Sequence, residues 1–246
     1  MRIALVADIH GNDIALEAVL ADIDDRGVDQ IACLGDVATL GPNPRAVLER
    51  VAERADITIM GNHDAYLGDP SLVAGYTDAP IIHDAVAWCR EELESKHFEI
   101  AAKFEATRRL ELCESHSLLL FHGSPRSDCE FLYDVTPAEI LDEALAGHAA
   151  THYAGGHTHL PLLRQHGDAV LINPGSVGLA FRDRPRGGPP TVVPHADYAL
   201  ATHEAGRVVI EHIRLALPST ALAAAADIEG FPLREQLVAA YTCSIG

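Results

Sequence analysis

The chain has 246 residues, of which 48% are hydrophobic and 22% are charged, so it can form one large domain with a substantial core. Its formal net charge of −18 argues against broad binding to nucleic acids or to anionic membranes, because an acidic surface repels both. A phosphate-bearing substrate is not excluded, since divalent cations bound in a cleft reverse the local sign of the potential.

The first sixty residues alternate between short apolar runs and amphipathic segments. Apolar residues at helical spacing, such as Ile14, Val19 and Ile23, distinguish a helix from the short strands around it. This alternation indicates βαβ units and a parallel sheet covered by helices. The predicted elements are a strand at 2–8, a helix at 12–27, a strand at 30–36, a helix at 42–55 and a strand at 57–60.

The later part of the chain follows a different pattern. Helices are predicted at 78–95 and 136–148, and a strand at 151–160 ends in a polar loop. Tightly joined pairs of strands are also predicted, at 108–123, 161–175 and 196–217. Such hairpins add antiparallel pairs, so we expect the sheet to be mixed.

Two segments carry less structural information. Residues 182–195 form a loop rich in proline, glycine and arginine. We expect residues 1–217 to form the domain and the tail at 218–246 to be partly helical, docking on the domain or on a partner.

Polar side chains follow five of the predicted strands at the point where each strand ends. Taken singly, each motif is also typical of a surface turn or a helix cap. All five occur in order behind apolar runs, and strand ends of an open α/β sheet meet at one crevice where ligands bind. We therefore expect one shared site. Its residues are Asp8, His10, Asp36, Asn62, His63, Asp64, His122, His157 and His159.

Most of these side chains are metal ligands by type. Carboxylates, imidazoles and one amide, without cysteine, suit Mn, Fe, Zn, Ni or Mg, and manganese is favoured. Seven ligands, taken from these nine residues, are too many for one ion. If one aspartate bridges two ions, each ion has four protein ligands. Two ions about 3.5–4 Å apart are the usual means of hydrolysing phosphate esters.

The motifs together resemble those of the calcineurin-like metallophosphoesterase superfamily. The shared patterns are D-x-H-G-N at 8–12, G-D at 35–36, G-N-H-D at 61–64, H-G at 122–123 and G-H-T-H at 156–159. The runs LGPNP, HGSP and NPGSVG are similar to those of its small bacterial and archaeal predicted-phosphodiesterase branch, and the resemblance extends from about residue 1 to 215.

The resemblance implies an α/β fold in which two mixed sheets pack face to face and are flanked by helices, with a dinuclear metal centre. It implies that His63 is an uncoordinated catalytic histidine whose ring is held by Asp64, and that Asn12 and Arg182 contact the substrate. The alternative for His63 is a residue that only supports the metal ligands. One ion would take Asp8, His10, Asp36 and His159, and the other would take Asp36, Asn62, His122 and His157.

The expected function is therefore a phosphodiesterase that acts on a small nucleotide-type substrate with a metal-activated water. A phosphomonoesterase or a dinucleoside-polyphosphate hydrolase is the alternative within enzymes, and a non-catalytic metal-binding scaffold of the same fold is the alternative outside them. The longer, arginine-rich segment after NPGSVG departs from the family pattern, as does ATLGPNP after G-D-V. Both departures leave the substrate open.

The remaining residues suggest a cytoplasmic protein. The five cysteines are odd in number, scattered and without a CxxC motif, which favours free thiols in a reducing compartment. No signal peptide or stretch of ~20 apolar residues is present, so we expect no membrane span, and the chain is compatible with a homo-oligomer. Nine other histidines are interpreted as core or surface residues, with His195 beside the arginine-rich loop as the one exception. They are residues 83, 97, 116, 148, 152, 166, 195, 203 and 212.

Overall fold

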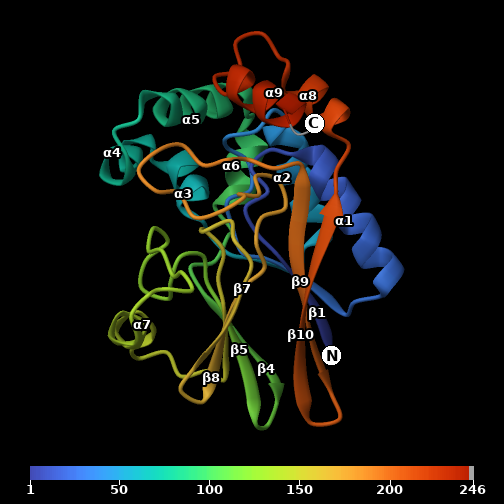
Figure 1. Cartoon of the computed structure of the whole chain (residues 1–246), viewed down its shortest axis with the longest axis vertical. Helices are drawn as coiled ribbons and strands as arrows, with labels where there is room; N and C mark the ends of the chain where they lie inside the picture. The colour runs from blue at the N-terminus through green and yellow to red at the C-terminus, as the bar shows by residue number, and fades with distance from the viewer. Residues whose placement is uncertain (244–246) are drawn as a thin grey trace.

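The computed structural model describes residues 1–243, which form two five-stranded mixed sheets (Figure 1). The first sheet has the order β10-β9-β1-β2-β3, in which β1 pairs with β2 and β2 with β3 in parallel, and β9 pairs antiparallel with β1 and β10. Its strands are β1 (Arg2–Val6), β2 (Gln30–Cys33), β3 (Ile57–Thr58), β9 (His195–Glu204) and β10 (Arg207–Ala216).

The second sheet has the order β4-β5-β6-β8-β7. The central strands pair in parallel, whereas the two outer pairs are antiparallel. Its strands are β4 (Arg108–Cys113), β5 (His116–Leu120), β6 (His152–Ala154), β7 (Leu162–His166) and β8 (Ala169–Asn173). The three predicted hairpins and the mixed sheet are therefore confirmed.

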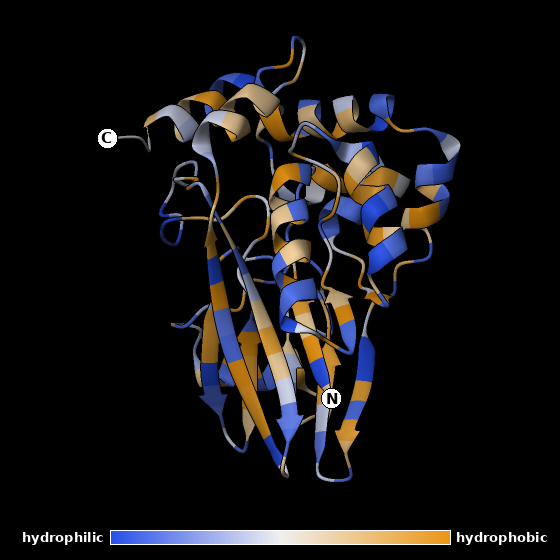
Figure 2. Cartoon of the chain, turned by 90° about the vertical axis from the view of Figure 1, so that its right-hand side faces the viewer, coloured by the Kyte–Doolittle hydropathy of each residue, from blue (hydrophilic) through white to orange (hydrophobic). Residues whose placement is uncertain are grey.

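The two sheets pack face to face through a shared apolar layer. Ile3, Leu5 and Leu34 from the first sheet are buried in one cluster with Leu118 and Ile172 from the second. Successive residues of a strand point to opposite faces of the sheet, so inward-facing and outward-facing residues alternate along it. Figure 2 shows this alternation of hydrophobic and hydrophilic residues along the long β9–β10 pair. This sandwich fixes the relative position of the loops at its upper end in Figure 1.

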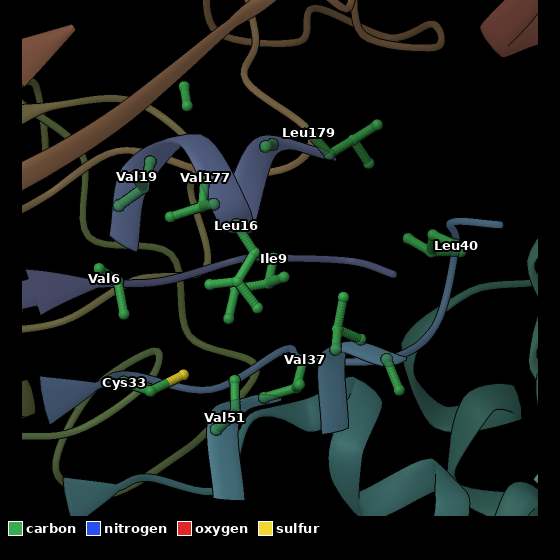
Figure 3. Close-up of a cluster of buried hydrophobic side chains, with 14 of the residues drawn as sticks. Val6, Ile9, Leu16, Val19, Cys33, Val37, Leu40, Val51, Val177 and Leu179 are labelled. Carbon is green, nitrogen blue, oxygen red and sulfur yellow. The ribbon is translucent and has the colours of Figure 1, made fainter. Parts of the chain in front are cut away.

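Helices cover the outer faces of the sandwich. α1 is capped by the side chain of Asn12 and ends at Gly27, whose φ of 64° suits a glycine. In Figure 3 apolar side chains of β1, α1 and α2 point toward one another. The helices are α1 (Asp13–Arg26), α2 (Pro44–Arg54), α3 (Asn62–Gly68), α4 (Val73–Tyr76), α5 (Pro80–Glu92), α6 (Ser95–Ala101), α7 (Ala138–Leu145), α8 (Ser219–Ala226) and α9 (Arg234–Cys243), with a 3₁₀ turn at Pro70–Leu72.

Within the described residues, the tail contains the helices α8 and α9 and packs on the outer layer of the first sheet. Leu222, Leu237 and Tyr241 are buried in the same cluster as the side chains of α1 and α2. The Phe231 ring lies 4.9 Å from that of Trp88 on α5. The division into a domain at 1–217 and a tail stays a prediction.

The third strand is shorter than predicted. After Thr58 the chain pairs only through an isolated bridge between Ile59 and Glu105.

The five cysteines are all free thiols. Among residues 1–243, no helix combines the length and apolar character needed to cross a bilayer.

Candidate metal and catalytic site

The nine polar residues predicted from the strand ends do meet at one end of the sandwich. They follow β1, β2 and β3 of the first sheet and β5 and β6 of the second, so the site lies across the upper edges of both sheets. All are buried, and none is more than 6% exposed. A set of carboxylates and imidazoles this deeply buried needs charge compensation. The residues are Asp8, His10, Asp36, Asn62, His63, Asp64, His122, His157 and His159.

The backbone at these positions is unusual. Seven non-glycine residues among 1–243 have positive φ, and five of them belong to the site. Left-handed backbone is unfavourable for residues other than glycine and collects at functional positions. The first strand is shorter than the prediction of 2–8: β1 ends at Val6, and a left-handed loop orients the side chains that follow. The five residues are Asp8, His10, Asp36, His157 and His159.

Glycines of the motifs give room for these side chains. A Cβ on Gly61 would lie 2.2 Å from Oδ1 of Asp36. A Cβ on Gly35 would lie 2.9 Å from Nδ1 of His122, and the φ of Gly35 is +97°. The glycines of the G-D and G-N-H-D motifs are therefore required by the packing of Asp36 and His122.

The first cluster joins Asp8, His10 and His159, whose ligand atoms all lie within 4.8 Å of one another. Nδ1 of His10 donates to the Thr39 carbonyl at 3.1 Å, and Nδ1 of His159 donates to the Leu179 carbonyl at 2.6 Å. Because carbonyls only accept, both neutral rings keep a lone pair on Nε2. These two Nε2 atoms face each other at 3.1 Å. A cation between or beside them would remove the repulsion.

Burial keeps these imidazoles neutral. Desolvation lowers the pKa of His159 to about 4, although the Leu179 carbonyl and Asp36 oppose this shift. Desolvation also lowers the pKa of His10 well below its ordinary value, and the neighbouring His159 lowers it further. A neutral imidazole with its second nitrogen fixed by a carbonyl is the usual form of a histidine metal ligand.

The second cluster joins Asp36, His122 and His157, again within 4.8 Å. Nδ1 of His122 donates to the Leu34 carbonyl at 2.7 Å, which leaves Nε2 facing Oδ1 of Asn62 at 3.2 Å and Oδ2 of Asp36 at 3.4 Å. Nε2 of His157 is buried without a hydrogen-bond partner. A buried ring nitrogen without a partner is costly, and coordination to a cation would satisfy it.

Asp36 lies between the two clusters. Its Oδ2 is 3.6 Å from Nε2 of His10 and 3.4 Å from Nε2 of His122, while its Oδ1 accepts the backbone N–H of His63 at 2.9 Å. Burial opposes its charge, but His122 and His63 hold the pKa of Asp36 well below its usual range. One ionised carboxylate therefore serves both clusters, and the donor sets of both fit divalent cations.

His63 lies beside the clusters with a partner that the sequence did not identify. Its ring is 5.3 Å from that of His10, and its Nδ1 is 2.7 Å from Oγ1 of Thr39. The prediction that Asp64 holds this ring is wrong. The Asp64 carboxylate instead accepts the backbone N–H groups of Asp36, Val37 and Gly61 at 2.7–3.0 Å.

Asp64 thus fixes the backbone on which the Asp36 side chain depends, and a hydroxyl takes the place next to His63. Thr39 is fully buried and uses its carbonyl for His10 and its hydroxyl for His63. The sequence offered one signal for Thr39. It lies three residues after Asp36, in the ATLGPNP stretch that departs from the family pattern.

Asn12 has a structural role. Its Oδ1 accepts the N–H of Ala15 at the start of α1, and its Nδ2 donates to the Gly178 carbonyl at 2.9 Å. Both ends of its amide hold the chain together, and the contact of Asn12 with substrate stays a prediction.

Arg182 lines a cavity of about 420 Å³ next to the clusters. Arg184, Arg186 and Arg214 line it too, and so does Phe181, whose ring stacks on His159 at 4.2 Å. One lining residue of this cavity therefore contacts a histidine of the first cluster, and the four arginines outnumber the one acidic lining residue, Asp134.

An aromatic path joins the same cavity to the second cluster. Phe131 stacks on the His157 ring at 4.2 Å and on Tyr133 at 5.6 Å. The Arg184 guanidinium lies over the Tyr133 ring at 5.5 Å. Aromatic faces and guanidinium groups next to the clusters suit a planar anionic ligand.

Comparison with known proteins gives consistent findings. Residues 1–193 match the family described as the calcineurin-like phosphoesterase superfamily domain. The phosphodiesterase YfcE of Escherichia coli strain K12 is 29% identical over 200 residues, covering 77% of this chain and 84% of the relative. The uncharacterized protein MJ0912 of Methanocaldococcus jannaschii is 28% identical over 188 residues, covering 72% and 76%.

Solved structures agree on the fold. The metallophosphoesterase from Sphaerobacter thermophilus superposes with a TM-score of 0.72 at 28% identity, with both chains fully covered (100% each). The hypothetical protein PH1004 from Pyrococcus horikoshii has a TM-score of 0.78 at 18% identity, covering 97% of this chain and 96% of its own, and supports the fold alone.

Proposed function

The chain belongs to the calcineurin-like phosphoesterase superfamily, and on that premise we propose that it hydrolyses a phosphodiester of a small nucleotide-type substrate with two divalent cations. It is a metal-dependent phosphoesterase; the proposal concerns the ester and the roles of the residues. The observation that carries it is the Asp36 carboxylate, whose Oδ2 lies within 3.6 Å of imidazole nitrogens from both clusters.

The proposed ligands follow the two clusters. When bound, the two ions would lower the pKa of a water molecule and neutralise charge on the phosphoryl oxygens. The donor set contains no thiolate, and manganese is the favoured ion among Mn, Fe, Zn, Ni and Mg. Asp8, His10, Asp36 and His159 would hold one ion, and Asp36, Asn62, His122 and His157 would hold the other.

His63 is the proposed general acid. Burial lowers the pKa of its ring, whereas the Asp36 carboxylate raises that pKa and favours the charged ring. In the protonated ring, Nδ1–H donates to the Thr39 hydroxyl, and the proton on Nε2 can be transferred to the leaving oxygen, which leaves a neutral imidazole. Thr39 therefore orients the ring, and Asp64 acts through the backbone of Asp36.

The arginine-lined cavity supports a nucleotide over a simple ester. Arg182 and Arg186 would pair with a second anionic group, since a guanidinium matches the geometry of phosphate oxygens. Phe131 and Tyr133 offer faces for a base. The number of arginines also favours a second candidate, a dinucleoside-polyphosphate hydrolase, because a polyphosphate carries more charge.

The test uses the chelator-treated chain reloaded with manganese. We expect metal-dependent turnover of bis(p-nitrophenyl) phosphate and lower KM values for cyclic nucleotides or dinucleotides. Replacing Arg182, Arg184 and Arg186 by Ala should raise KM for the nucleotide by about tenfold or more and leave the aryl ester nearly unchanged, since each charge-assisted hydrogen bond contributes about 1.5–3 kcal/mol.

Arg207→Ala, an exposed arginine on the β9–β10 hairpin, is the matched control and should change neither KM. Equal effects of the triple substitution on both substrates would remove the arginines from substrate binding. Bound metal without turnover of any ester would favour a non-catalytic scaffold. A preference for dinucleoside polyphosphates would select the second candidate. The expected cytoplasmic location belongs to the proposal as well.

A further inference from the structure

A third group of metal-ligating side chains lies at the opposite end of the sandwich. Cys113 and His116 flank the turn between β4 and β5, and His203 is near the end of β9. One ligand atom of each lies within 4.8 Å of the others. Both hairpins are at the lower end of Figure 1, away from the loops that hold Asp36. The group therefore joins two strands of the second sheet to one strand of the first, at a place that the phosphoesterase site does not use.

The spacing of two of these groups already suits one ion. Sγ of Cys113 is 3.4 Å from Nδ1 of His116. Sulfur and nitrogen bound to one tetrahedral zinc, at about 2.3 Å and about 2.0–2.1 Å, lie about 3.5 Å apart. The turn between β4 and β5 thus presents a thiol and an imidazole as neighbouring ligands.

His203 supplies an independent observation. Its Nε2 is buried and has no hydrogen-bond partner, although its ring lies only 6.0 Å from that of His116. A buried ring nitrogen without a partner is costly, and coordination would satisfy it. His152 packs against the far side of the cluster, with its ring 5.9 Å from His116.

The local chemistry provides a thiolate near neutral pH. Ser115 Oγ lies 3.4 Å from Sγ of Cys113 and 2.9 Å from Nδ1 of His116. Hydrogen bonding to Ser115, with a smaller contribution from His116, lowers the pKa of the Cys113 thiol to about 7. The exposed acidic side chains of Glu114 and Glu204 flank the ligands and favour a cation there.

We propose that Cys113, His116 and His203 bind one zinc ion that joins the two sheets. A thiolate with two imidazoles is a zinc donor set, and it differs from the cysteine-free phosphoesterase site. The partial exposure of all three residues leaves the fourth position to water. The ion would stabilise the fold by holding the β4–β5 hairpin against β9.

Cobalt(II) distinguishes this site from the other one. Only a site with cysteine gives a thiolate-to-cobalt charge-transfer band in the near ultraviolet. The full chain is treated with chelator and its phosphoesterase site is reloaded with manganese. Titration with cobalt should then produce this band, saturating at one added cobalt ion per chain. Cys113→Ser should abolish it, and His203→Ala should weaken the affinity by at least about tenfold, with manganese-dependent esterase activity unchanged in both variants.

The matched control is Cys129→Ser. Cys129 is the thiol whose Sγ lies 3.8 Å from the Tyr66 hydroxyl near the phosphoesterase site, and its removal should leave the band intact. Zinc should bleach the band by displacing cobalt, whereas manganese should not. Absence of the band, its survival in Cys113→Ser, its loss in Cys129→Ser or equal bleaching by manganese would each overturn the proposal.

Discussion

At one end of the sandwich the strands run out into loops whose polar side chains are buried, whereas at the other end they turn back in tight hairpins. Gly167 and Gly206 provide the positive φ values that the β7–β8 and β9–β10 turns require, and both turns are exposed. At the site end, left-handed backbone falls on aspartates and histidines such as Asp8 and His157.

The difference indicates that the site end depends on bound cations as well as on contacts within the chain. Each hairpin is specified by the few residues of its turn and by the pairing of its two strands. The site end brings together carboxylates and imidazole lone pairs that oppose one another, such as the Nε2 atoms of His10 and His159 at 3.1 Å. We therefore expect divalent cations to matter for the site end and substitutions there to change metal binding and catalysis first.

The largest expected effect is that of Asp36→Asn. Because one carboxylate lies between both clusters, its loss should release both ions and lower manganese-dependent turnover by at least about 10³-fold; removal of even a single group that stabilises the transition state typically costs 10²–10³-fold. Metal analysis and kinetics measure this. The manganese-dependent increase in Tm should vanish too, since an ion that binds only the folded state stabilises it by about 2.7 kcal/mol at 100 times Kd.

Asp142→Asn, on α7, removes an exposed ion pair with His166 and is the matched control. It should keep the metal content, the activity and the manganese-dependent increase in Tm. If Asp36→Asn retained either ion at normal affinity, the two ends of the sandwich would not differ in the way described.

His63→Ala separates catalysis from metal binding within the site end. Turnover of a nucleoside or alkyl ester should fall by about 10²–10⁴-fold, the usual contribution of a general acid. The nitrophenyl ester should lose clearly less, because its leaving group needs no proton. Metal content should stay normal. The control His166→Ala should leave both rates unchanged, and equal losses on both esters would show that His63 does not donate a proton to the leaving group.

Metal affinity should depend on pH through His122. Burial opposes charge on this ring, but Asp36 and Asp8 raise its pKa to about 10 in the metal-free chain, above the ordinary value of 6.5. The protonated ring stabilises the metal-free fold fully below pH 6.5, and this contribution is lost as pH rises through about 10.

A cation must displace that proton to bind His122. Between pH 6.5 and about 9, the apparent affinity for manganese should therefore rise by about tenfold per pH unit for each proton released. Calorimetry in buffers of different ionisation enthalpy measures the released proton directly. An affinity independent of pH, with no proton release, would contradict the assigned state of His122.

Thr39→Val should have the smallest effect. The backbone carbonyl still holds His10, but the hydroxyl contact with His63 is lost, so kcat should fall by about tenfold with metal content and KM preserved. Thr39→Ser keeps the hydroxyl and should restore kcat. Failure of Ser to restore it would mean that the methyl group, through packing, is what matters.

The sequence was sufficient for the order of the strands and of the longer helices, because hydrophobic period and turn residues are local signals. It did not predict the short helices α3, α4 and α6. It also predicted which polar residues would meet, since the ends of parallel strands share one edge. It misassigned Asp64, and it did not predict the hydrogen bond from Asn12 to Gly178, because these backbone contacts depend on how loops from separate strands pack. It also missed Thr39, Phe131 and Tyr133, because their contacts with the site arise only from tertiary packing.

The histidines of the phosphoesterase site could be identified from the sequence, whereas those of the proposed zinc site could not. His122 and His157 follow strands within recognisable motifs, whereas His116 and His203 lie on hairpins with no motif around them. Only the pairing of β4 with β5 and the facing of the two sheets bring His116 and His203 together. Their placement therefore could not be predicted from spacing along the chain.

Anomalous diffraction from crystals of the manganese-loaded chain tests the central proposal most directly. Data collected at the manganese absorption edge should show two peaks about 3.5–4 Å apart, both within bonding distance of Asp36. His10 and His159 should contact one peak, and His122 and His157 the other. A single ion, or ions bound away from Asp36, would contradict the proposal of a centre bridged by this carboxylate.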